Sequence, residues 1–480
     1  MLNYLLPAIG GLIAVLLCVL LVRACRLRPK KTAPHAAACM PADAAPALDR
    51  FGQMLRLATV WPRTGEIDEA PFAAFLPLLQ RLYPSLFEVL ETHCINQYGL
   101  LLRWPGADPE AQPVVLMAHY DVVSADASQW AHPPFCGEVI GDEIWGRGAM
   151  DTKCIIAALL EAAQTLLKEG FRPARDLYFS FTNNEETGGD TTPAIVDWLE
   201  ANGVRPWFVL DEGGAVVHAP AFGVDQDFAM VGVSEKGVVD LRLTVHGQPG
   251  HSSTPSASDA PAQLMQAIRK AAAVRYPARL TGATRDMLRQ VASYAPFGLR
   301  LVFGNLWLFS PLVKSIMKKN GETNAMLRTT AALTMLQGSD AINIIPPTAS
   351  AGFSVRVAPW DSTRAVLRRI SDAVGDTAEV SFDYKFEPSP VSSYDCDAFA
   401  LLSKVIDAAY PQVPAVPYVM TGGTDSKHFT RICPNVYRFA GFRFTDAERA
   451  AMHGNDERLQ TQSYLDGIGF YYQLLRQINE

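Results

Sequence analysis

Strand-like apolar runs alternate along this chain with helix-like patterns. The runs at residues 113–118, 177–182 and 207–210 are short and largely apolar, as expected of strands buried on both faces. One helix-like pattern extends from Cys154 to Leu167, and another follows Pro193. This alternation predicts an α/β catalytic domain with a mostly parallel, helix-flanked sheet. Its chemistry is expected at the carboxyl ends of the strands.

The hydrophobic pattern changes between residues 237 and 389. Helix-like stretches there, at 260–274 and 362–374, are flanked by alternating runs at 238–245, 351–357 and 380–386. This order predicts an inserted α+β domain of the ferredoxin-like kind. The catalytic domain would then consist of residues 48–236 and 390–480.

An apolar stretch at residues 275–327 lies within this predicted inserted domain. It contains two strongly apolar segments, 297–303 and 306–309. So much apolar surface has to be buried somewhere. The stretch either thickens the core of the inserted domain or lines a pocket for an acyl chain, and the pattern leaves both possibilities open.

Candidate metal ligands follow the strand-like runs. His119 ends the first run, and Asp121 lies two residues further on, so in extended chain the two side chains share a face. His119 could then bind a metal through one ring nitrogen while Asp121 accepts the N–H of the other. The alternative is a histidine in an ordinary loop.

Carboxylates followed by glycines end the other two runs. Glu185 and Glu186 precede two glycines, and adjacent residues cannot point the same way, so one is expected to bind metal and the other to act as general base. Asp211 ends the third run. Asp151 stands where a helix-like pattern begins, a place where an aspartate also serves as a cap without any metal.

The balance of charges favours a metal centre over these separate explanations. Asp151, Glu186 and Asp211 would place three negative charges in one cleft beside Glu185, which is unfavourable without compensation. Two divalent cations bridged by Asp151 and a hydroxide would neutralise them. His119 and His453 would supply one imidazole each, and nitrogen and oxygen donors suit zinc. The sequence therefore predicts two Zn²⁺ per chain.

These motifs resemble the co-catalytic zinc aminoacylase and carboxypeptidase family, most closely its carboxypeptidase S branch. That branch includes secreted animal enzymes that make and cleave N-fatty-acyl amino acids. The resemblance extends from about residue 47 to the C-terminus. The shared segments are LMAH at 116–119, VSEKG at 233–237, GHSS at 250–253, NIIPP at 343–347 and TDS at 424–426.

The resemblance implies a role for each candidate residue of the centre. Glu185 would be the general base, Asp121 would orient a ligand, and the peptide bond before Thr152 would be cis. Two zinc sites would share one aspartate, with His119, Asp151 and Asp211 at one and Asp151, Glu186 and His453 at the other.

The resemblance also makes the inserted domain a lid that closes over the substrate and often forms the dimer interface. His251 would stabilise the oxyanion, and Arg356 would bind the substrate carboxylate through two parallel hydrogen bonds. Asn343, Gly423 and Thr424 would contact the substrate as well. Without the resemblance, the first three would be a loop histidine, a solvated strand arginine and a turn asparagine.

The N-terminal segment predicts a membrane anchor. Residues 3–22 contain no charged side chain, which is about long enough to span a bilayer, and no basic residue precedes them. A basic cluster follows within residues 23–31, and residues 32–47 form an Ala/Pro-rich tether. The positive-inside rule would place the enzyme on the cytoplasmic side, whereas the secreted relatives favour the opposite side.

Composition narrows the class of function. The chain of 480 residues has room for two domains, and its net charge of −7 gives no reason to expect a nucleic-acid partner. The expected activity is zinc-dependent hydrolysis of the amide bond in N-acyl amino acids or short peptides with a free carboxylate. The alternatives are a carboxypeptidase or dipeptidase and, more remotely, a non-catalytic binding protein.

Overall fold

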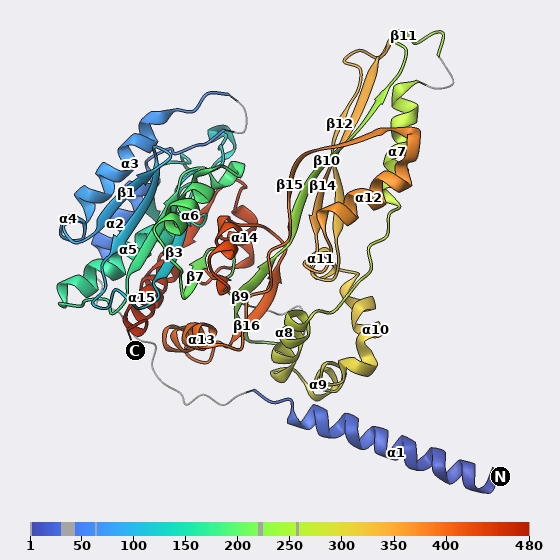
Figure 1. Ribbon diagram of the computed structural model, residues 1–480, viewed down its shortest axis with the longest axis horizontal. Coiled ribbons are helices and arrows are strands. Elements are labelled where there is room, and N and C mark those ends of the chain that lie inside the picture. The colour runs from blue at the N-terminus through green and yellow to red at the C-terminus, as the bar shows by residue number, and fades with distance from the viewer. Residues whose placement is uncertain (1, 30–43, 63–64, 219–223, 256–258, 480) are drawn as a thin grey trace.

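The structure is a computed structural model that describes residues 2–29, 44–62, 65–218, 224–255 and 259–479. Its larger part is built on a nine-stranded sheet in the order β1-β2-β6-β3-β7-β17-β9-β16, with β8 paired to β9 (Figure 1). In chain order these strands are β1 (Glu91–Ile95), β2 (Gly99–Trp104), β3 (Val114–His119), β6 (Leu177–Thr182), β7 (Phe208–Asp211), β8 (Val216–His218), β9 (Asp227–Glu235), β16 (Ala415–Met420) and β17 (Val436–Arg438).

This sheet is mixed, whereas the sequence predicted a mostly parallel one. Strands β6, β3, β7 and β17 run parallel, as do β9 and β16. Strands β1, β2 and β8 pair antiparallel with their neighbours, and β17 meets β9 antiparallel. Only residues 96–98 connect β1 to β2, and so short a connection permits only an antiparallel pair.

Both faces of the central strands are buried, as the uninterrupted apolar runs predicted. In β3, Val114, Leu116 and Ala118 belong to the larger core, whereas Val115 and Met117 pack on the opposite face. The larger core is covered by α2 (Ala44–Leu55), α3 (Glu69–Leu82), α4 (Pro84–Phe87), α5 (Lys153–Lys168), α13 (Asp397–Ala409) and α15 (Thr461–Gln477). The opposite face is covered by α6 (Thr191–Ala201) and η5 (Asp425–Arg431).

Short elements complete the catalytic part. A three-stranded sheet in the order β18-β5-β4 contains β4 (Glu138–Ile140), β5 (Glu143–Trp145) and β18 (Arg458–Gln460). The short helices are η1 (Ala127–Gln129), η2 (Glu185–Thr187) and α14 (Asp446–Ala451). The peptide bond between Asp151 and Thr152 is cis, as the family resemblance implied.

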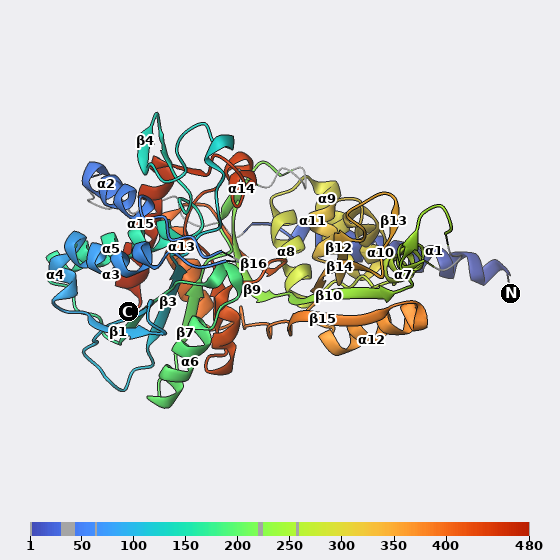
Figure 2. The same cartoon turned by 90° about the horizontal axis from the view of Figure 1, so that it is seen from above.

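A second, four-stranded sheet in the order β12-β14-β10-β15 is formed by residues inserted between β9 and α13. Its elements are β10 (Gly237–His246), α7 (Ala260–Ala272), β12 (Thr330–Gln337), β14 (Thr348–Val357), α12 (Thr363–Val374), η4 (Gly375–Thr377) and β15 (Glu379–Phe386). Apart from η4, their order is the βαββαβ arrangement expected of a ferredoxin-like unit. Figure 2 shows this inserted domain beside the nine-stranded sheet, not over it. Its service as a lid stays a prediction.

Four helices occupy the stretch between α7 and β12, and we call them the insertion helices. They are α8 (Gly282–Ser293), α9 (Phe297–Gly304), α10 (Leu306–Met317) and α11 (Gly321–Ala325). Their apolar side chains pack with Phe228 of β9 and Val416 of β16, and not with the core of the four-stranded sheet. The insertion therefore extends the catalytic part of the molecule and does not thicken the core of the inserted domain.

Helix α1 (Leu2–Arg26) leaves the rest of the molecule near α9. By length and composition it is the one helix within the described residues that could cross a membrane, and almost all of its apolar surface is exposed. It is long and apolar enough to be a membrane anchor or a signal peptide. Most of the predicted tether at 32–47 lies outside the described residues.

Candidate metal centre

The carboxylate of Asp151 lies between the two histidines that the sequence singled out. Its Oδ1 is 2.9 Å from Nε2 of His119, at the end of β3, and its Oδ2 is 2.7 Å from Nε2 of His453, which follows α14. Asp151 lies two residues before α5. Three segments that are distant in sequence therefore bring one carboxylate and two imidazoles into contact.

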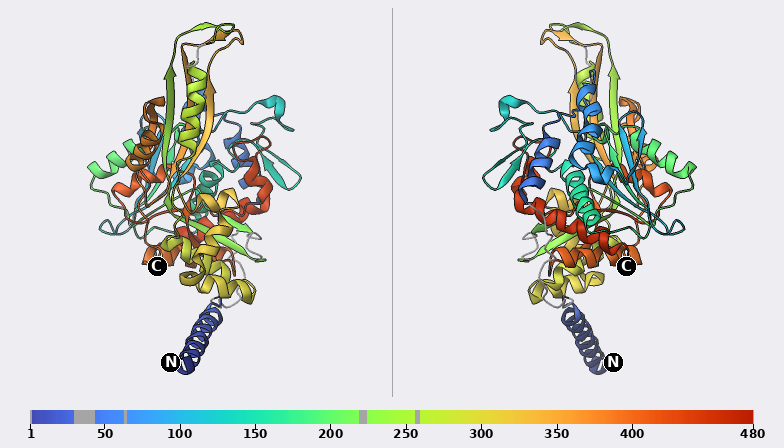
Figure 3. Two further views of the ribbon diagram at one scale, coloured as in Figure 1. Left: turned by 90° about the vertical axis from the view of Figure 1, so that its right-hand side faces the viewer. Right: turned by 90° about the vertical axis from the view of Figure 1, so that its left-hand side faces the viewer.

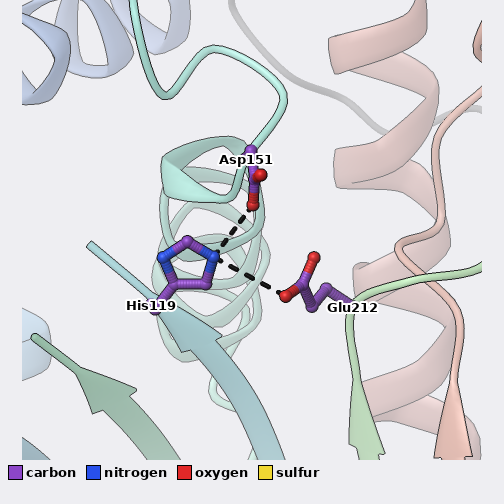
Figure 4. Close-up of side chains that lie close together, drawn as sticks. All are labelled: His119, Asp151 and Glu212. Atoms are coloured by element: carbon purple, nitrogen blue, oxygen red, sulfur yellow. Dashed lines mark hydrogen bonds and ion pairs between the residues drawn. The ribbon is translucent and has the colours of Figure 1, made fainter. Parts of the chain in front are cut away.

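Two groups of side chains could each hold a metal ion, and they share Asp151. His119, Asp151 and Glu212 form one group, shown in Figure 4, and Asp151, Glu186 and His453 form the other. Nε2 of His119 is 3.6 Å from Oε1 of Glu212, and Nε2 of His453 is 3.2 Å from Oε2 of Glu186. Two donor atoms bound to one zinc at about 2.0–2.2 Å lie roughly 3.3–3.6 Å apart. The residues fit zinc in donor type, and the contact between His119 and Glu212 fits in spacing, whereas the contacts of Asp151 with the two histidines are at hydrogen-bond distance and would lengthen around an ion.

The structure places Glu212 in the first group, where the sequence prediction placed Asp211. Oδ2 of Asp211 accepts a hydrogen bond of 3.0 Å from the backbone amide of Ser426, at the start of η5. Because consecutive residues at a strand end point in opposite directions, Glu212 turns toward His119 instead. The Asp-Glu-Gly-Gly segment contained both carboxylates, and alternation alone could not decide between them.

Asp121 positions the glutamate pair with its side chain and His119 with its backbone. Its carboxylate accepts the backbone amides of Glu185 and Glu186, each at 3.1 Å. Nδ1 of His119 lies 2.9 Å from the backbone oxygen of Asp121 and 3.5 Å from the carboxylate. The predicted contact between the Asp121 side chain and His119 is thus the weaker one, since the backbone oxygen lies closer.

The electrostatics of the cleft favour a cation. Burial, followed by the charges of nearby acids, raises the pKa of Glu212 to about 8, and burial also raises the pKa of Glu185 well above its usual range. Hydrogen bonds to Asp151 and Glu186 raise the pKa of His453 to about 10. Protein groups alone thus hold extra protons here, which is the behaviour of a site whose acids lack a positive partner.

Glu457 holds the loop that carries Asp151, a role that no sequence pattern indicated. Its carboxylate accepts from Nη1 of Arg147 at 2.7 Å and from the backbone amides of Gly148, Met150 and Asp151 at 3.1, 2.8 and 3.2 Å. From the sequence alone, a buried glutamate cannot be told from a surface charge until its partner is known. That partner lies 310 residues away.

The predicted substrate-binding residues lie in three separate places. His251 is exposed on β11 (Gly250–His251), which pairs with β13 (Ile344–Ile345), and the backbone oxygen of Asn343 accepts from the amide of Ser252 at 3.2 Å. These two residues are neighbours at the tip of the inserted domain. Figure 1 shows β11 at the end of that domain away from the nine-stranded sheet.

The other three predicted residues lie nearer the catalytic part. Arg356 lies on β14, opposite Val238 of β10. The amide and hydroxyl of Thr424 donate to the carboxylate of Glu235 at 3.0 and 2.9 Å, and the same carboxylate accepts from Nε of Arg438 at 2.5 Å. Gly423 lines a cavity beside the metal-site residues. Only Gly423 thus borders the space next to the centre.

This cavity has a volume of about 580 Å³. Its lining includes Asp151, Glu185, Glu212 and His453. Insertion helices border it as well, through Met287 and Val291 of α8 and through Glu322, Thr323 and, directly after α11, Met326. The insertion therefore lines a cavity next to the candidate metal centre.

A family model of known proteins matches most of this chain. Residues 115–477 match the model described as peptidase family M20/M25/M40. The chain belongs to the M20 family. It is therefore an enzyme of a metallopeptidase family whose members act on amide bonds.

Relatives within the M20 family cover nearly the whole chain. The probable carboxypeptidase S-like protein 2 of Dictyostelium discoideum is 34% identical, over 86% of this chain and 81% of the relative. The N-fatty-acyl-amino acid synthase/hydrolase PM20D1.1 of Danio rerio is 33% identical, over 89% of this chain and 85% of the relative. Both agree with the carboxypeptidase S branch that the motifs indicated.

Solved structures share the M20 fold at low sequence identity. The dipeptidase Dug1p of Saccharomyces cerevisiae superposes with a TM-score of 0.66 at 14% identity, covering 92% of this chain and 99% of that one. The metallo-carboxypeptidase Sso-CP2 of Sulfolobus solfataricus gives a TM-score of 0.64 at 17% identity, covering 90% and 99%. These likenesses establish the mixed α/β fold.

Proposed function

We propose that this chain is a zinc-dependent hydrolase of N-acyl amino acids whose acyl group occupies the cavity beside the metal centre. The observation that carries the proposal is the composition of that cavity. The candidate metal ligands and residues of the insertion helices line the same cavity. The fish relative, named for fatty-acyl amino acids, supports this choice of substrate.

Methionine side chains form much of the apolar lining of the cavity. Six of the chain's 13 methionines line it, namely Met150, Met230, Met287, Met326, Met420 and Met452. Methionine is flexible and polarizable, so such a lining adapts to an apolar chain of variable shape. A dipeptide side chain would need no such space, whereas a long acyl group would fill it.

The proposed centre holds two zinc ions. His119, Asp151 and Glu212 would hold one ion, and Asp151, Glu186 and His453 would hold the other. Bound zinc would polarise the amide carbonyl and lower the pKa of an attacking water to near 7. Three carboxylates and two neutral imidazoles balance most of the charge of two divalent ions, which supports this stoichiometry.

Glu185 is the proposed general base. It borders the cavity next to Asp151, and its backbone amide is held by Asp121. Its carboxylate would accept a proton from the attacking water and deliver it to the nitrogen of the departing amino acid. A buried carboxylate beside two cations can alternate between the ionised and the protonated state, as this role requires.

The inserted domain is the proposed lid. The chain crosses between the two sheets at residues 236–237 and again near 387–388. The two crossings lie side by side, because Gly237 packs closely against Pro388. Rotation at these two crossings would carry His251, Asn343 and Arg356 toward the centre. Arg356 would then bind the substrate carboxylate and His251 the oxyanion. Thr424, which belongs to the catalytic part, would contact the substrate from the side opposite the lid. Pairing of two inserted domains would form a homodimer.

A peptidase acting on short peptides is the second candidate, favoured by the name of the Dictyostelium relative. A panel of N-acetyl-, N-octanoyl- and N-oleoyl-phenylalanine with matched dipeptides separates the two. The proposal predicts that kcat/KM rises with acyl length by about fourfold for each methylene that is fully buried. Faster turnover of dipeptides than of every acyl amino acid would instead establish the peptidase.

A further inference from the structure

Helix α1 joins the body of the enzyme at the corner between α9 and α10. Nε of Arg23 donates to the backbone oxygen of Gly304 at 3.2 Å, and Nδ2 of Asn305 donates to the backbone oxygen of Leu20 at 3.1 Å. Leu20 and Ala24 are buried in this contact, whereas the other residues of α1 from Tyr4 onward are exposed. Figure 3 shows α1 running away from the base of the molecule, where α9 and α10 lie.

The outer face of α10 is apolar although it is open. Leu308, Leu312 and Ile316 recur every four residues and are 40%, 50% and 57% exposed. A different stripe of the same helix, which includes Val313 and Met317, is already buried against the other insertion helices. A helix that is apolar on both its buried and its outer face is not suited to water.

Each of these two helices also exposes an aromatic side chain. Trp307 of α10 is 56% exposed, and Phe297 of α9 is 42% exposed. Tryptophan is enriched where a membrane meets water, because its ring is apolar and its N–H is polar. Residues 297–319 contain four basic side chains and no acidic one, although the whole chain carries a charge of −7.

A cationic cavity lies beside Trp307. It has a volume of about 310 Å³, and its lining includes Arg285 and Arg289 of α8 and Lys314 of α10. Asp286 is the acidic neighbour on α8, with Oδ1 3.6 Å from Nη1 of Arg289 and Oδ2 bonded to the hydroxyl of Tyr394 at 2.9 Å. Three cations against one partly engaged carboxylate leave this cavity suited to a phosphate group.

We infer that α9 and α10 form a second membrane contact, lying in the interface of the bilayer that α1 spans. The apolar face of α10 would enter the acyl boundary, and the phosphate of an anionic lipid would sit among Arg285, Arg289 and Lys314. The bilayer is the favoured occupant because α1 is attached to α9 and α10 and brings the membrane to their outer face. Interfacial helices with an apolar face and basic flanks bind membranes in this manner.

This membrane contact would bring lipid close to the acyl cavity. Helix α8 contacts α9 and also lines the cavity beside the metal centre through Met287 and Val291. An acyl amino acid dissolved in the bilayer would then reach the cavity past a single helix. That route rests on the proposed function, whereas the membrane contact itself does not.

Quenching of Trp307 by lipid tests the contact without any catalytic readout. The full chain is reconstituted into phosphatidylcholine vesicles containing phosphatidylcholine labelled with doxyl near the top of the acyl chain. We expect quenching that W307F loses and that W198F retains, because Trp198 lies on α6, which contacts β1, β2 and β6 at the edge of the nine-stranded sheet away from β16. Equal quenching in the wild type and W307F would overturn the inference.

If lipid does not quench Trp307, the aqueous quencher acrylamide shows what covers this residue instead. Strong quenching of Trp307 by acrylamide would show a face open to water. Protection from both quenchers would show a protein surface, such as a second copy of the chain, over α10. Either outcome refutes the bilayer contact.

Labelled phosphatidylglycerol tests the phosphate cavity. At equal mole fraction it should quench Trp307 more strongly than labelled phosphatidylcholine in the wild type, and equally in the double variant R285Q/K314Q. The matched control R205Q/R431Q, which removes two cations near α6, should keep the preference. Loss of the preference in millimolar inorganic phosphate would indicate a site for phosphate in general, and absence of any preference would refute the lipid site.

Discussion

The backbone amide of Ser426 donates a hydrogen bond of 3.0 Å to the carboxylate of Asp211. This bond holds Asp211 against η5, so its neighbour Glu212 faces His119 and Asp151. The choice between two adjacent carboxylates is thus made by a residue more than 200 positions later in the chain.

Exchange of each carboxylate for its amide should affect zinc differently. Glu212→Gln removes a charged ligand from the first group, and we expect a chain that retains about one zinc instead of about two. Asp211→Asn keeps the shape and an acceptor for the amide of Ser426, so its zinc content should stay near that of the wild type. Metal analysis of both purified variants decides, and the reverse pattern would return the ligand role to Asp211.

Glu185→Gln should separate metal binding from turnover. The amide keeps the size of the side chain but cannot take a proton from water, so we expect kcat to fall by roughly 10²- to 10⁴-fold. Zinc content should remain that of the wild type, because Glu185 belongs to neither ligand group. A variant with near-normal kcat would show that another group moves the proton.

Filling the cavity should change the preference for acyl length. Val291→Phe places extra volume where the acyl chain would lie, and we expect kcat/KM for N-oleoyl-phenylalanine to fall about tenfold while that for the acetyl compound changes little. Val313→Phe is the matched control, because Val313 is equally buried in the insertion helices but does not border the cavity. An equal loss on both substrates would remove the acyl group from this cavity.

Removal of Glu457 should destabilise the protein and weaken zinc binding together. Glu457→Ala leaves Arg147 buried without its carboxylate and frees the loop that carries Asp151, at a cost of about 3–5 kcal/mol in the free energy of unfolding. Glu143→Ala breaks the more exposed pair with Arg458 and should cost about 0–1 kcal/mol. Chemical denaturation of the zinc-loaded chains measures both costs, and similar values would contradict the role given to Glu457.

Much of the catalytic part followed from local patterns. The apolar runs at 177–182 and 207–210 correspond to β6 and β7, and the helix pattern from Cys154 corresponds to α5. The clustering of His119, Asp151, Glu186 and His453 also followed, because each lies at the end of an element or beside a turn. Residues whose neighbours along the chain determine their direction were therefore predictable.

The features that the sequence did not predict depend on partners distant in the chain. Strands β1, β2 and β8 and the antiparallel contact of β17 with β9 made the sheet mixed, and the more exposed β1 carries no apolar run to reveal it. Glu457 gains its role from Arg147, and Glu212 gains its place from the bond between Asp211 and Ser426. The sequence pattern assigned the insertion helices to the inserted domain, whereas their apolar side chains pack against β9 and β16.

The proposed centre is a pair of zinc ions that share the carboxylate of Asp151. X-ray absorption at the zinc edge, on the full chain loaded with two equivalents, tests it most directly. We expect scattering between two metals about 3.5–4 Å apart, lost in Asp151→Ala. Two bound zinc ions without any such metal–metal scattering would contradict a shared aspartate.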